Sequence, residues 1–244
     1  MRKLAAFAAP ITLPGGATLR YLAVGDIHGC FRALTTLALA VPFGPEDTVV
    51  ALGDYVDRGP DSCAVLDWLI AYGRRAKLVA LRGNHELMML DARDGDDALR
   101  EWLECGGDVA LASYSPFGDG GRLADVPDSH WQFLEDETRA WFETETHFFV
   151  HANAYADCAL EEQPDFMLYW EPFDDPPPHR SGKTMVCGHT PQQSGQPRNV
   201  GHAVCIDTGA CGAGWLTCLD VESGRYWQAN QRGETRSCRL NPDA

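Results

Sequence analysis

Short apolar stretches recur along this chain, and each is followed directly by a polar cluster. They are YLAVGD (residues 21–26), DTVVALGD (47–54), KLVALRGN (77–84), THFFVHA (146–152), KTMVCGHT (183–190) and HAVCIDTG (202–209). Apolar, β-branched stretches of this length are typical of buried strands rather than of helices. The pattern therefore predicts β-strands at these places.

Two stretches of helical character separate the first three predicted strands. They are residues 30–40 (CFRALTTLALA) and 62–73 (SCAVLDWLIAYG), the second with Asp61 or Ser62 as its N-cap and Gly73 as its stop. Strands that alternate with helices pair in parallel through right-handed crossovers. We therefore expect an α/β protein that begins with a βαβαβ unit.

The segment of about residues 91–145 follows a different pattern. Residues 97–114 and 130–145 both predict helices, so we expect a mostly helical insertion over the edge of the sheet. Further on, residues 215–229 predict a hairpin that turns at Ser223–Gly224. The length of 244 residues fits a single domain, residues 1–244, that carries this insertion.

Composition and charge narrow the class of partner. The formal net charge is −15, and such a surface repels nucleic-acid backbones and anionic membranes, so we expect neither as a partner. The nine cysteines are spread singly, which is typical of reduced thiols. The short apolar start is interrupted by Pro10 and Pro14, and no apolar stretch approaches the roughly 20 residues that cross a bilayer. These features predict a cytoplasmic protein.

Side chains suited to metal binding or acid–base chemistry follow five of the predicted strands. They are Asp26 and His28 after the first, Asp54, Asp57 and Arg58 after the second, Asn84 and His85 after the third, His151 after the fourth, and His189 after the fifth. Each motif alone is explained by turn geometry or by a structural histidine. In an open α/β sheet, however, the carboxyl ends of the strands share one crevice. Carboxylates and imidazoles gathered there would be costly to bury without a cation.

Two metal ions make physical sense of this set. Asp54 can bridge them with its two oxygens, while Asp26 and His28 complete the protein ligands of the first ion. The ligands that complete the second ion are Asn84, His151 and His189. Mixed oxygen and nitrogen ligation without thiolates suits Mn, with Fe or Zn as alternatives. Two such ions share a hydroxide that attacks phosphorus in an in-line displacement.

The motifs resemble those of a known family. GDIHG (25–29), GDYVDRGPDS (53–62), LRGNHE (81–86), FVHA (149–152) and GHT (188–190), in this order, are similar to the signature of the calcineurin-like metallophosphoesterases. Within that family, DYVDRG and RGNHE resemble the phosphoprotein phosphatase branch, including its small bacterial and phage (phage lambda phosphatase-like) members. The resemblance implies a four-layer α/β/β/α sandwich, with two mixed β-sheets flanked by helices.

The resemblance also implies separate roles for neighbouring residues. It assigns Asp26, His28 and Asp54 to the first metal, and the set Asp54, Asn84, His151 and His189 to the second. His85 matches a residue that is not a ligand but protonates the leaving oxygen, oriented by Asp57, and Arg58 matches an arginine that binds phosphate oxygens. Arg58, Asn84 and His85 are thus the expected substrate-binding residues. An acid beside a carboxylate and a forked arginine are independently sensible for this chemistry.

Two residues depart from the pattern of the phosphoprotein phosphatase relatives. Glu171, in FMLYWEPF, stands about where a second phosphate-binding arginine is expected, and Arg180 in the proline-rich loop is a candidate replacement. Pro191, in GHTP, occupies the place where many metallophosphoesterases outside the phosphoprotein phosphatase branch have another histidine. The first metal is therefore left with fewer imidazoles.

Three functions follow from these residues. The leading hypothesis is a dinuclear metal-dependent phosphomonoesterase that acts as a protein phosphatase on phosphoserine and phosphothreonine, or on phosphotyrosine, with small phosphoesters as further substrates. The alternative is a symmetrical diadenosine tetraphosphate hydrolase, since these enzymes have a similar GDIHGC start. The third is an inactive phosphoprotein-binding module, which the missing arginine favours but the complete ligand set opposes.

Overall fold

The structure is a computed structural model that describes residues 20–115 and 120–241, so the segment around Pro10 and Pro14 lies outside the described residues. The strands are β1 (Tyr21–Val24), β2 (Thr48–Ala51), β3 (Lys77–Leu81), β4 (Thr138–Arg139), β5 (Trp141–Glu143), β6 (His147–Val150), β7 (Thr184–Cys187), β8 (Arg198–Asn199), β9 (Ala203–Cys205), β10 (Leu216–Asp220), β11 (Arg225–Ala229) and β12 (Thr235–Arg239). The helices are α1 (Phe31–Ala40), α2 (Ser62–Gly73), α3 (Asn84–Asp91), α4 (Asp96–Trp102), α5 (Asp108–Ala112), α6 (Asp128–Gln132) and α7 (Asp165–Tyr169). All the predicted strand positions contain a strand.

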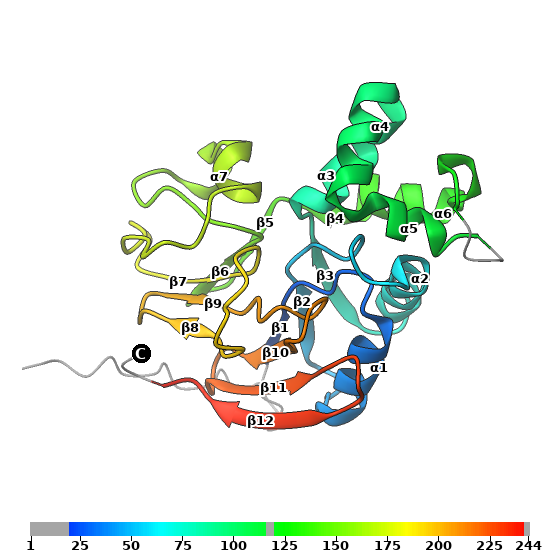
Figure 1. Cartoon of the computed structure of the whole chain (residues 1–244). Helices are drawn as coiled ribbons and strands as arrows, with labels where there is room; N and C mark the ends of the chain where they lie inside the picture. Colours follow the sequence, from blue (N-terminus) through cyan, green and yellow to red (C-terminus); the bar gives the residue numbers. More distant parts are fainter. Residues whose placement is uncertain (1–19, 116–119, 242–244) are drawn as a thin grey trace, which may run out of the picture.

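Two mixed sheets form the centre of the molecule (Figure 1). The first has the order β12-β11-β10-β1-β2-β3-β4, and the second has the order β5-β6-β7-β9-β8. Strands β1, β2 and β3 pair in parallel, as the predicted βαβαβ unit requires, whereas β10 pairs antiparallel to β1. In the second sheet β6, β7 and β9 are parallel. The carboxyl ends of the parallel strands can therefore meet at one edge.

Alternating side chains of the strands fill different cores. In β2, Val49 and Ala51 pack toward the helices α1 and α2, while Val50 packs toward the second sheet. Phe149 of β6 joins Val50 in the core between the sheets. Residues two apart on a strand face the same side, so strands buried on both faces read as continuous apolar stretches.

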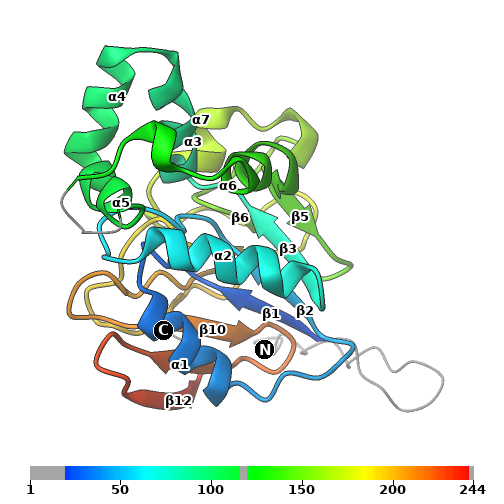
Figure 2. The same ribbon diagram turned by 90° about the vertical axis from the view of Figure 1, so that its right-hand side faces the viewer.

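Helices cover the outer faces of both sheets, which confirms the predicted architecture. Helices α1 and α2 lie across β1 and β2 of the first sheet (Figure 2). Over the second sheet, the outer layer is thin and consists of α7 and loops, with Leu168 and Tyr169 in its core. No helix within residues 20–115 and 120–241 is long and apolar enough to cross a membrane.

The predicted helix at residues 130–145 is wrong in its second half. Helical turns end at Glu137, and the chain then forms β4 and β5. Trp141 pairs with Val150, and Phe142 pairs with Phe149 and stacks on its ring at 5.9 Å. Pairing with β6 and burial of the aromatic rings outweigh the local helical pattern. The helical insertion is therefore shorter than the range of about 91–145 predicted.

The predicted hairpin near the end of the chain is confirmed. Strands β10 and β11 are antiparallel, and the turn places Gly224 at φ 66°, a conformation that glycine adopts without strain. Strand β12, which the sequence pattern did not reveal, adds a further antiparallel pair at the edge of the sheet. Its residues are mostly exposed and polar, so they carry no apolar signal.

Candidate metal centre and acid pair

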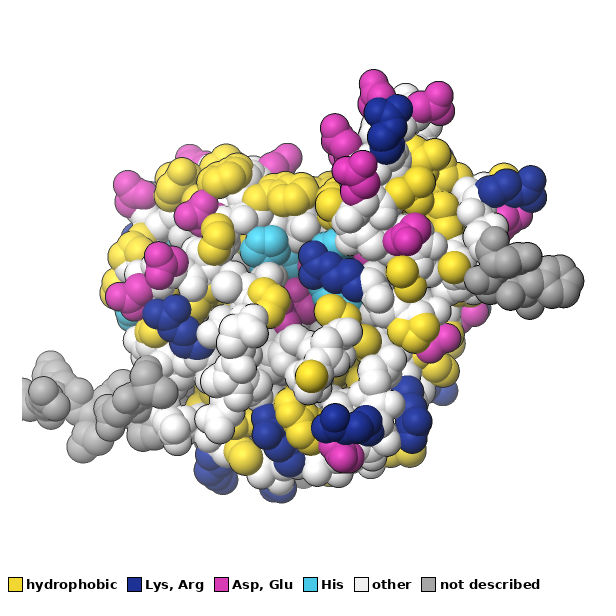
Figure 3. All heavy atoms as spheres, in the orientation of Figure 1, with side chains coloured by type: hydrophobic (Ala, Val, Ile, Leu, Met, Phe, Trp, Pro, Cys, Tyr) yellow, Lys and Arg dark blue, Asp and Glu magenta, His cyan; other side chains and the backbone are white. Residues whose placement is uncertain are grey.

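The side chains that were predicted to share a crevice come together at the carboxyl ends of the strands. Donor atoms of Asp54, His151 and His189 lie within 4.8 Å of one another, and so do those of His28, Asp54 and His85. Histidine and acidic side chains gather at the centre of one face, with a basic side chain beside them (Figure 3). The predicted neighbourhood therefore exists in three dimensions.

The backbone is in an unusual conformation at this place. Among the described residues, the non-glycine residues with positive φ are His28 (46°), Asp54 (52°), Asp57 (72°), Arg58 (65°), Asp175 (52°) and His189 (63°). All but Asp175 belong to the predicted site. Such conformations cost energy for residues with a Cβ, and they gather where side chains must be aimed at a functional centre.

Each predicted imidazole ligand has one nitrogen bound to a backbone carbonyl. Nδ1 of His28 lies 3.0 Å from the Val56 oxygen, and Nδ1 of His151 lies 2.9 Å from the Leu52 oxygen. For His189 the bonded nitrogen is Nε2, 3.1 Å from the oxygen of Trp170. A carbonyl only accepts, so that nitrogen carries the proton and the other nitrogen keeps its lone pair.

The lone-pair nitrogens point at shared oxygen atoms. Nε2 of His28 is 3.4 Å from Oδ2 of Asp54, and Nε2 of His151 is 3.4 Å from Oδ1 of the same carboxylate. Oδ1 of Asn84 lies 3.0 Å from Nε2 of His151 and 3.1 Å from Nδ1 of His189. Two acceptor atoms facing each other bind nothing by themselves, so the arrangement calls for cations between them.

Electrostatics agree with this interpretation. Burial lowers the pKa of His28 to about 3 and that of His189 to about 4, so both rings are neutral near pH 7 and free to act as ligands. The donors are carboxylate, amide and imidazole, a set that suits Mn, Fe or Zn. Divalent ions held there would neutralise phosphate charge and activate water.

Asp26 is joined to the site by hydrogen bonds with the backbone of His189. Both of its carboxylate oxygens accept the backbone N–H of His189, at 3.1 and 3.0 Å. Burial, followed by the charges of Asp207 and Asp54, raises the pKa of Asp26 well above its ordinary value. Three buried carboxylates thus lie near one another, which again favours a cation.

His85 stands beside the metal ligands in a separate hydrogen-bonded chain. Its Nδ1 lies 2.6 Å from Oδ2 of Asp57, and Nε1 of Trp102 donates to that carboxylate at 2.9 and 3.0 Å. Burial alone would lower the pKa of His85, but the charge of Asp54 and the hydrogen bond to Asp57 leave it raised. A raised pKa keeps the ring protonated to higher pH, which suits a proton donor.

Trp102 is a functional neighbour that the sequence pattern did not reveal. It lies on α4, distant in sequence from Asp57, and is fully buried. A helical position with apolar neighbours favours core packing, and only the fold shows that the indole N–H reaches a carboxylate.

Glu86 was also missed, although it lies within the motif LRGNHE. Its carboxylate is fully buried and accepts the backbone N–H groups of Asp54, Tyr55, Val56 and Gly83, at 2.7–3.3 Å. It therefore fixes the loop after β2 to the start of α3. Its position two residues after the expected ligand Asn84 was the signal in the sequence that could have marked it as part of the site.

Arg58 is the exposed member of the set. Its Nη1 lies 3.0 Å from Nε2 of His28, and its backbone N–H donates to the oxygen of Gly106. Arg180, the candidate replacement for the missing arginine, donates through Nη1 to the oxygen of Asp157 at 2.9 Å. Glu171 is half-buried next to Trp170. A phosphate-binding role for Arg58 stays a prediction, as does the replacement by Arg180.

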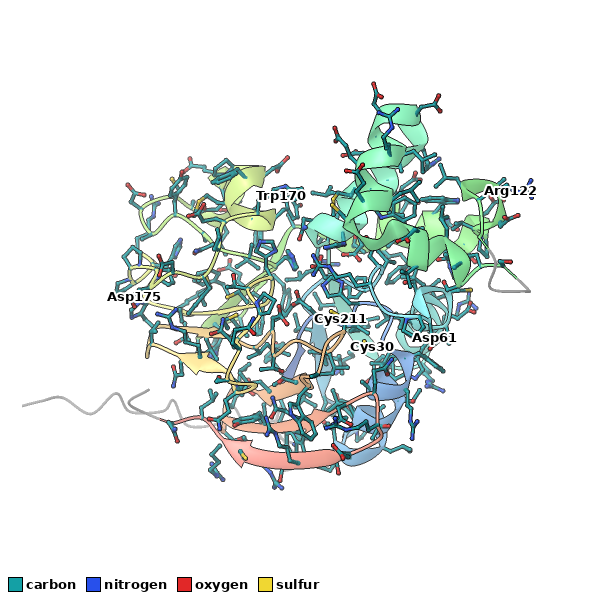
Figure 4. All side chains as sticks on the ribbon, viewed as in Figure 1. Cys30, Asp61, Arg122, Trp170, Asp175 and Cys211 are labelled. Atoms are coloured by element: carbon teal, nitrogen blue, oxygen red, sulfur yellow. The ribbon has the colours of Figure 1, made fainter. Side chains whose placement is uncertain are left out.

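Two exposed aromatic side chains lie on or directly after α7, and the second of them, Trp170, contacts His189 through its backbone. Phe166 is 56% exposed and Trp170 is 41% exposed, and we call this pair the aromatic rim. The backbone oxygen of Trp170 lies 3.1 Å from Nε2 of His189, so the backbone of Trp170 lies against that ring. Figure 4 shows Trp170 at the end of α7 that faces the helices α3 and α4. Large exposed apolar groups beside polar donors are typical of ligand contacts.

Comparison with known proteins identifies the family of this chain. The sequence profile of the family described as calcineurin-like phosphoesterase matches residues 19–202. The symmetrical bis(5'-nucleosyl)-tetraphosphatase of Salmonella arizonae is 28% identical over 265 aligned residues, covering 84% of this chain and 92% of that enzyme. Serine/threonine-protein phosphatase 1 of Salmonella typhimurium is 46% identical over 86 residues, which are 35% of this chain and 38% of that protein.

Solved structures agree with the fold. A crystal structure of a protein proposed to be a diadenosine tetraphosphatase superposes with a TM-score of 0.62 and 22% identity, covering 94% of this chain and 96% of that one. The family match extends over most of the sequence and includes all the predicted site residues. The chain belongs to the calcineurin-like phosphoesterase family, and it is a phosphoester hydrolase.

Proposed function

We propose that this protein is a dinuclear metal-dependent hydrolase that cleaves dinucleoside tetraphosphates symmetrically. The observation that carries the proposal is the extent of the similarity to the symmetrical bis(5'-nucleosyl)-tetraphosphatases, which spans 84% of this chain and 92% of those enzymes. This was the alternative hypothesis from the sequence. The protein phosphatase hypothesis came from the motifs DYVDRG and RGNHE, and the relative named as a protein phosphatase matches only 35% of this chain.

The proposed roles of the residues follow the geometry. Asp26, His28 and Asp54 hold one divalent ion, and the second is held by Asp54, Asn84, His151 and His189. The hydrogen-bonded chain from Trp102 through Asp57 to His85 supports His85 as the general acid. Water attacks a central phosphorus, the bond to the bridging oxygen breaks, and His85 gives its proton to the departing phosphate. The products are two nucleoside diphosphates.

The aromatic rim supports a nucleotide as the substrate. Stacking of a base on an aromatic ring contributes about 1–3 kcal/mol, and Trp170 lies next to the proposed ligand His189. Glu171 beside it carries no positive charge for a second phosphate contact. The base would then supply binding energy that a second arginine supplies elsewhere.

A product assay tests the proposal. Metal-stripped protein, reconstituted with Mn²⁺, should convert diadenosine tetraphosphate to ADP alone, as resolved by ion-exchange chromatography. The variant His85→Asn serves as a control for contaminating hydrolases. Formation of ATP and AMP, or no turnover with Mn²⁺, Fe²⁺ or Zn²⁺, would rule out this function.

A protein phosphatase activity is the second candidate. It is favoured by the 46% identity to serine/threonine-protein phosphatase 1 over 86 residues. Rates on phosphoserine, phosphothreonine and phosphotyrosine peptides, measured beside diadenosine tetraphosphate under the same conditions, separate the two. A kcat/KM higher for any phosphopeptide would reverse the order proposed here. Phosphopeptide binding without turnover would instead support the binding-module hypothesis.

A further inference from the structure

Asp207 is a buried carboxylate with an unused oxygen. It follows β9 and is 2% exposed, and its Oδ1 accepts the backbone N–H of Gly209 at 3.0 Å. Oδ2 is the buried side-chain oxygen or nitrogen atom without a hydrogen-bond partner in the part of the chain that the structure describes. A buried charged oxygen without a partner is strongly unfavourable unless a cation or a donor approaches it.

The packing of two strand ends brings Asp207 close to Asp26 of the candidate metal centre. Gly25, directly after β1, packs so closely against Ile206, directly after β9, that a Cβ on Gly25 would lie 2.8 Å from the Ile206 carbonyl oxygen. The residue after Gly25 is Asp26, and the residue after Ile206 is Asp207. After burial, the charge of Asp207 is the largest influence that raises the pKa of Asp26. The two carboxylates thus approach each other inside the protein instead of being kept apart.

Among the described residues, no neighbouring side chain forms a hydrogen bond with Oδ2 of Asp207. The Arg58 guanidinium is close enough to oppose the effect of burial on the pKa of Asp207. Yet Arg58 is exposed, and its Nη1 lies 3.0 Å from His28 rather than at Oδ2 of Asp207. A cation bound between the two carboxylates would satisfy both.

We propose that Asp207 is a positioning residue of the ion site that contains Asp26, contributing a further negative charge and an acceptor oxygen toward the hydrated divalent cation. The inference rests on the proposed role of Asp26 as an ion ligand. It gives the first ion, which has fewer imidazoles than the second, a compensating carboxylate. Asp207 acts through the ion and is not itself a group that touches the substrate.

Binding of Mn²⁺ to metal-stripped protein tests the inference. We expect the natural chain to bind two Mn²⁺ ions, and Asp207→Asn to bind one of them about 10–100-fold more weakly, the effect typical of groups just outside the ligand set. Free Mn²⁺ is measured by electron paramagnetic resonance. Asp220→Asn is the matched control, because Asp220 is also buried but contacts Arg20 and the turn at Ser223. It should leave both affinities unchanged.

Thermal unfolding separates an ion-site role from a structural role. Without metal, Asp207→Asn should be as stable as the natural chain or more stable, since it removes an unpaired buried charge. With Mn²⁺ it should gain less stability than the natural chain, because ligand-induced stabilisation follows affinity. Equal Mn²⁺ affinities, or equal destabilisation with and without Mn²⁺, would overturn the proposal.

A further variant distinguishes failure of this inference from failure of the proposed ion site. If Asp26→Asn loses one Mn²⁺ site while Asp207→Asn keeps both, only the role of Asp207 is wrong. If Asp26→Asn also keeps both, the assignment of the first ion is wrong, and the inference falls with it.

Discussion

The strand-end ligands and the aromatic rim border the same centre but are built in opposite ways. Asp54, Asn84 and His151 are at most 5% exposed, and hydrogen bonds fix Asp54 and His151. Phe166 and Trp170 are 56% and 41% exposed; Phe166 lies on the five-residue helix α7, and Trp170 directly follows that helix. One region is rigid and buried, and the other is open.

The difference assigns different tasks to the two regions. Ligands and acids must be held to within a fraction of an ångström to work, so they belong on buried strand ends with positive-φ backbone. A rim of exposed rings tolerates variation and selects what reaches the centre. We therefore expect changes at the strand ends to alter chemistry and metal binding, and changes at the rim to alter substrate preference.

The largest effect is expected for His85→Asn. Loss of the proton donor should lower kcat by about 10²–10⁴-fold, and most strongly for leaving groups of high pKa. Both Mn²⁺ ions should remain bound, because His85 is hydrogen-bonded to Asp57 and is not one of the proposed ligands. Steady-state kinetics on p-nitrophenyl phosphate and an alkyl phosphate, with Mn²⁺ titration, measure both parts.

His130→Asn is the control for His85→Asn. His130 is equally buried and contacts Asp67 and Tyr114 away from the site. It should lower stability but leave kcat of the folded protein unchanged. If His85→Asn lost metal as strongly as it lost turnover, the separation of acid and ligands would be wrong.

A smaller effect is expected for Asn84→Ala. This variant should lower the affinity for Mn²⁺ rather than kcat at saturating Mn²⁺. Its amide oxygen faces both His151 and His189, so one Mn²⁺ should bind at least about 100-fold more weakly, since outer partners alone are worth about 10–100-fold. Excess Mn²⁺ should restore much of the activity. Asn230→Ala, another buried asparagine, should not change Mn²⁺ affinity.

Most of the sheet and nearly all of the proposed centre could be predicted from sequence. Strands such as β2, buried on both faces, carry a strong apolar signal, and the polar residues after them mark the edge where they meet. The parallel βαβαβ beginning and the hairpin at Gly224 followed from the same patterns and from turn chemistry.

What escaped prediction depends on contacts between distant segments. Residues 138–143 read as helix, yet their partners on β3 and β6 make them strands. Trp102 looked like a core residue because its indole N–H meets Asp57 only after α4 has packed. Asp207 belongs to none of the motifs, and its unpaired oxygen is visible only once the ends of β1 and β9 are brought together.

Trp102→Phe should sharpen the role of the buried acid chain. The variant removes the N–H that orients Asp57, and a hydrogen bond to a charged group is worth about 1.5–3 kcal/mol. Because Trp102 acts on His85 only through Asp57, we expect the low end of that range, a loss of roughly tenfold in kcat. The loss should be larger for alkyl phosphates than for p-nitrophenyl phosphate, because only the former depend on proton donation. Trp68→Phe, which replaces the indole stacked on Tyr72 by a smaller ring, should change kcat for both substrates equally or not at all.

The smallest effect, Trp170→Ala, most directly tests whether the rim selects the substrate. Stacking at the low end of about 1–3 kcal/mol per base gives an increase of about 5-fold in KM for diadenosine tetraphosphate. For p-nitrophenyl phosphate, which has no base, KM should stay unchanged, and kcat should change little for either, since the hydrogen bond of Trp170 to His189 is made by its backbone carbonyl, which alanine keeps. Tyr155→Ala removes another exposed ring of the same half, 46% exposed, and should be neutral on both. Equal changes in KM for both substrates would mean that Trp170 supports His189 rather than binding the nucleoside. The aromatic rim would then belong to the metal centre, and its proposed role in substrate selection would be wrong.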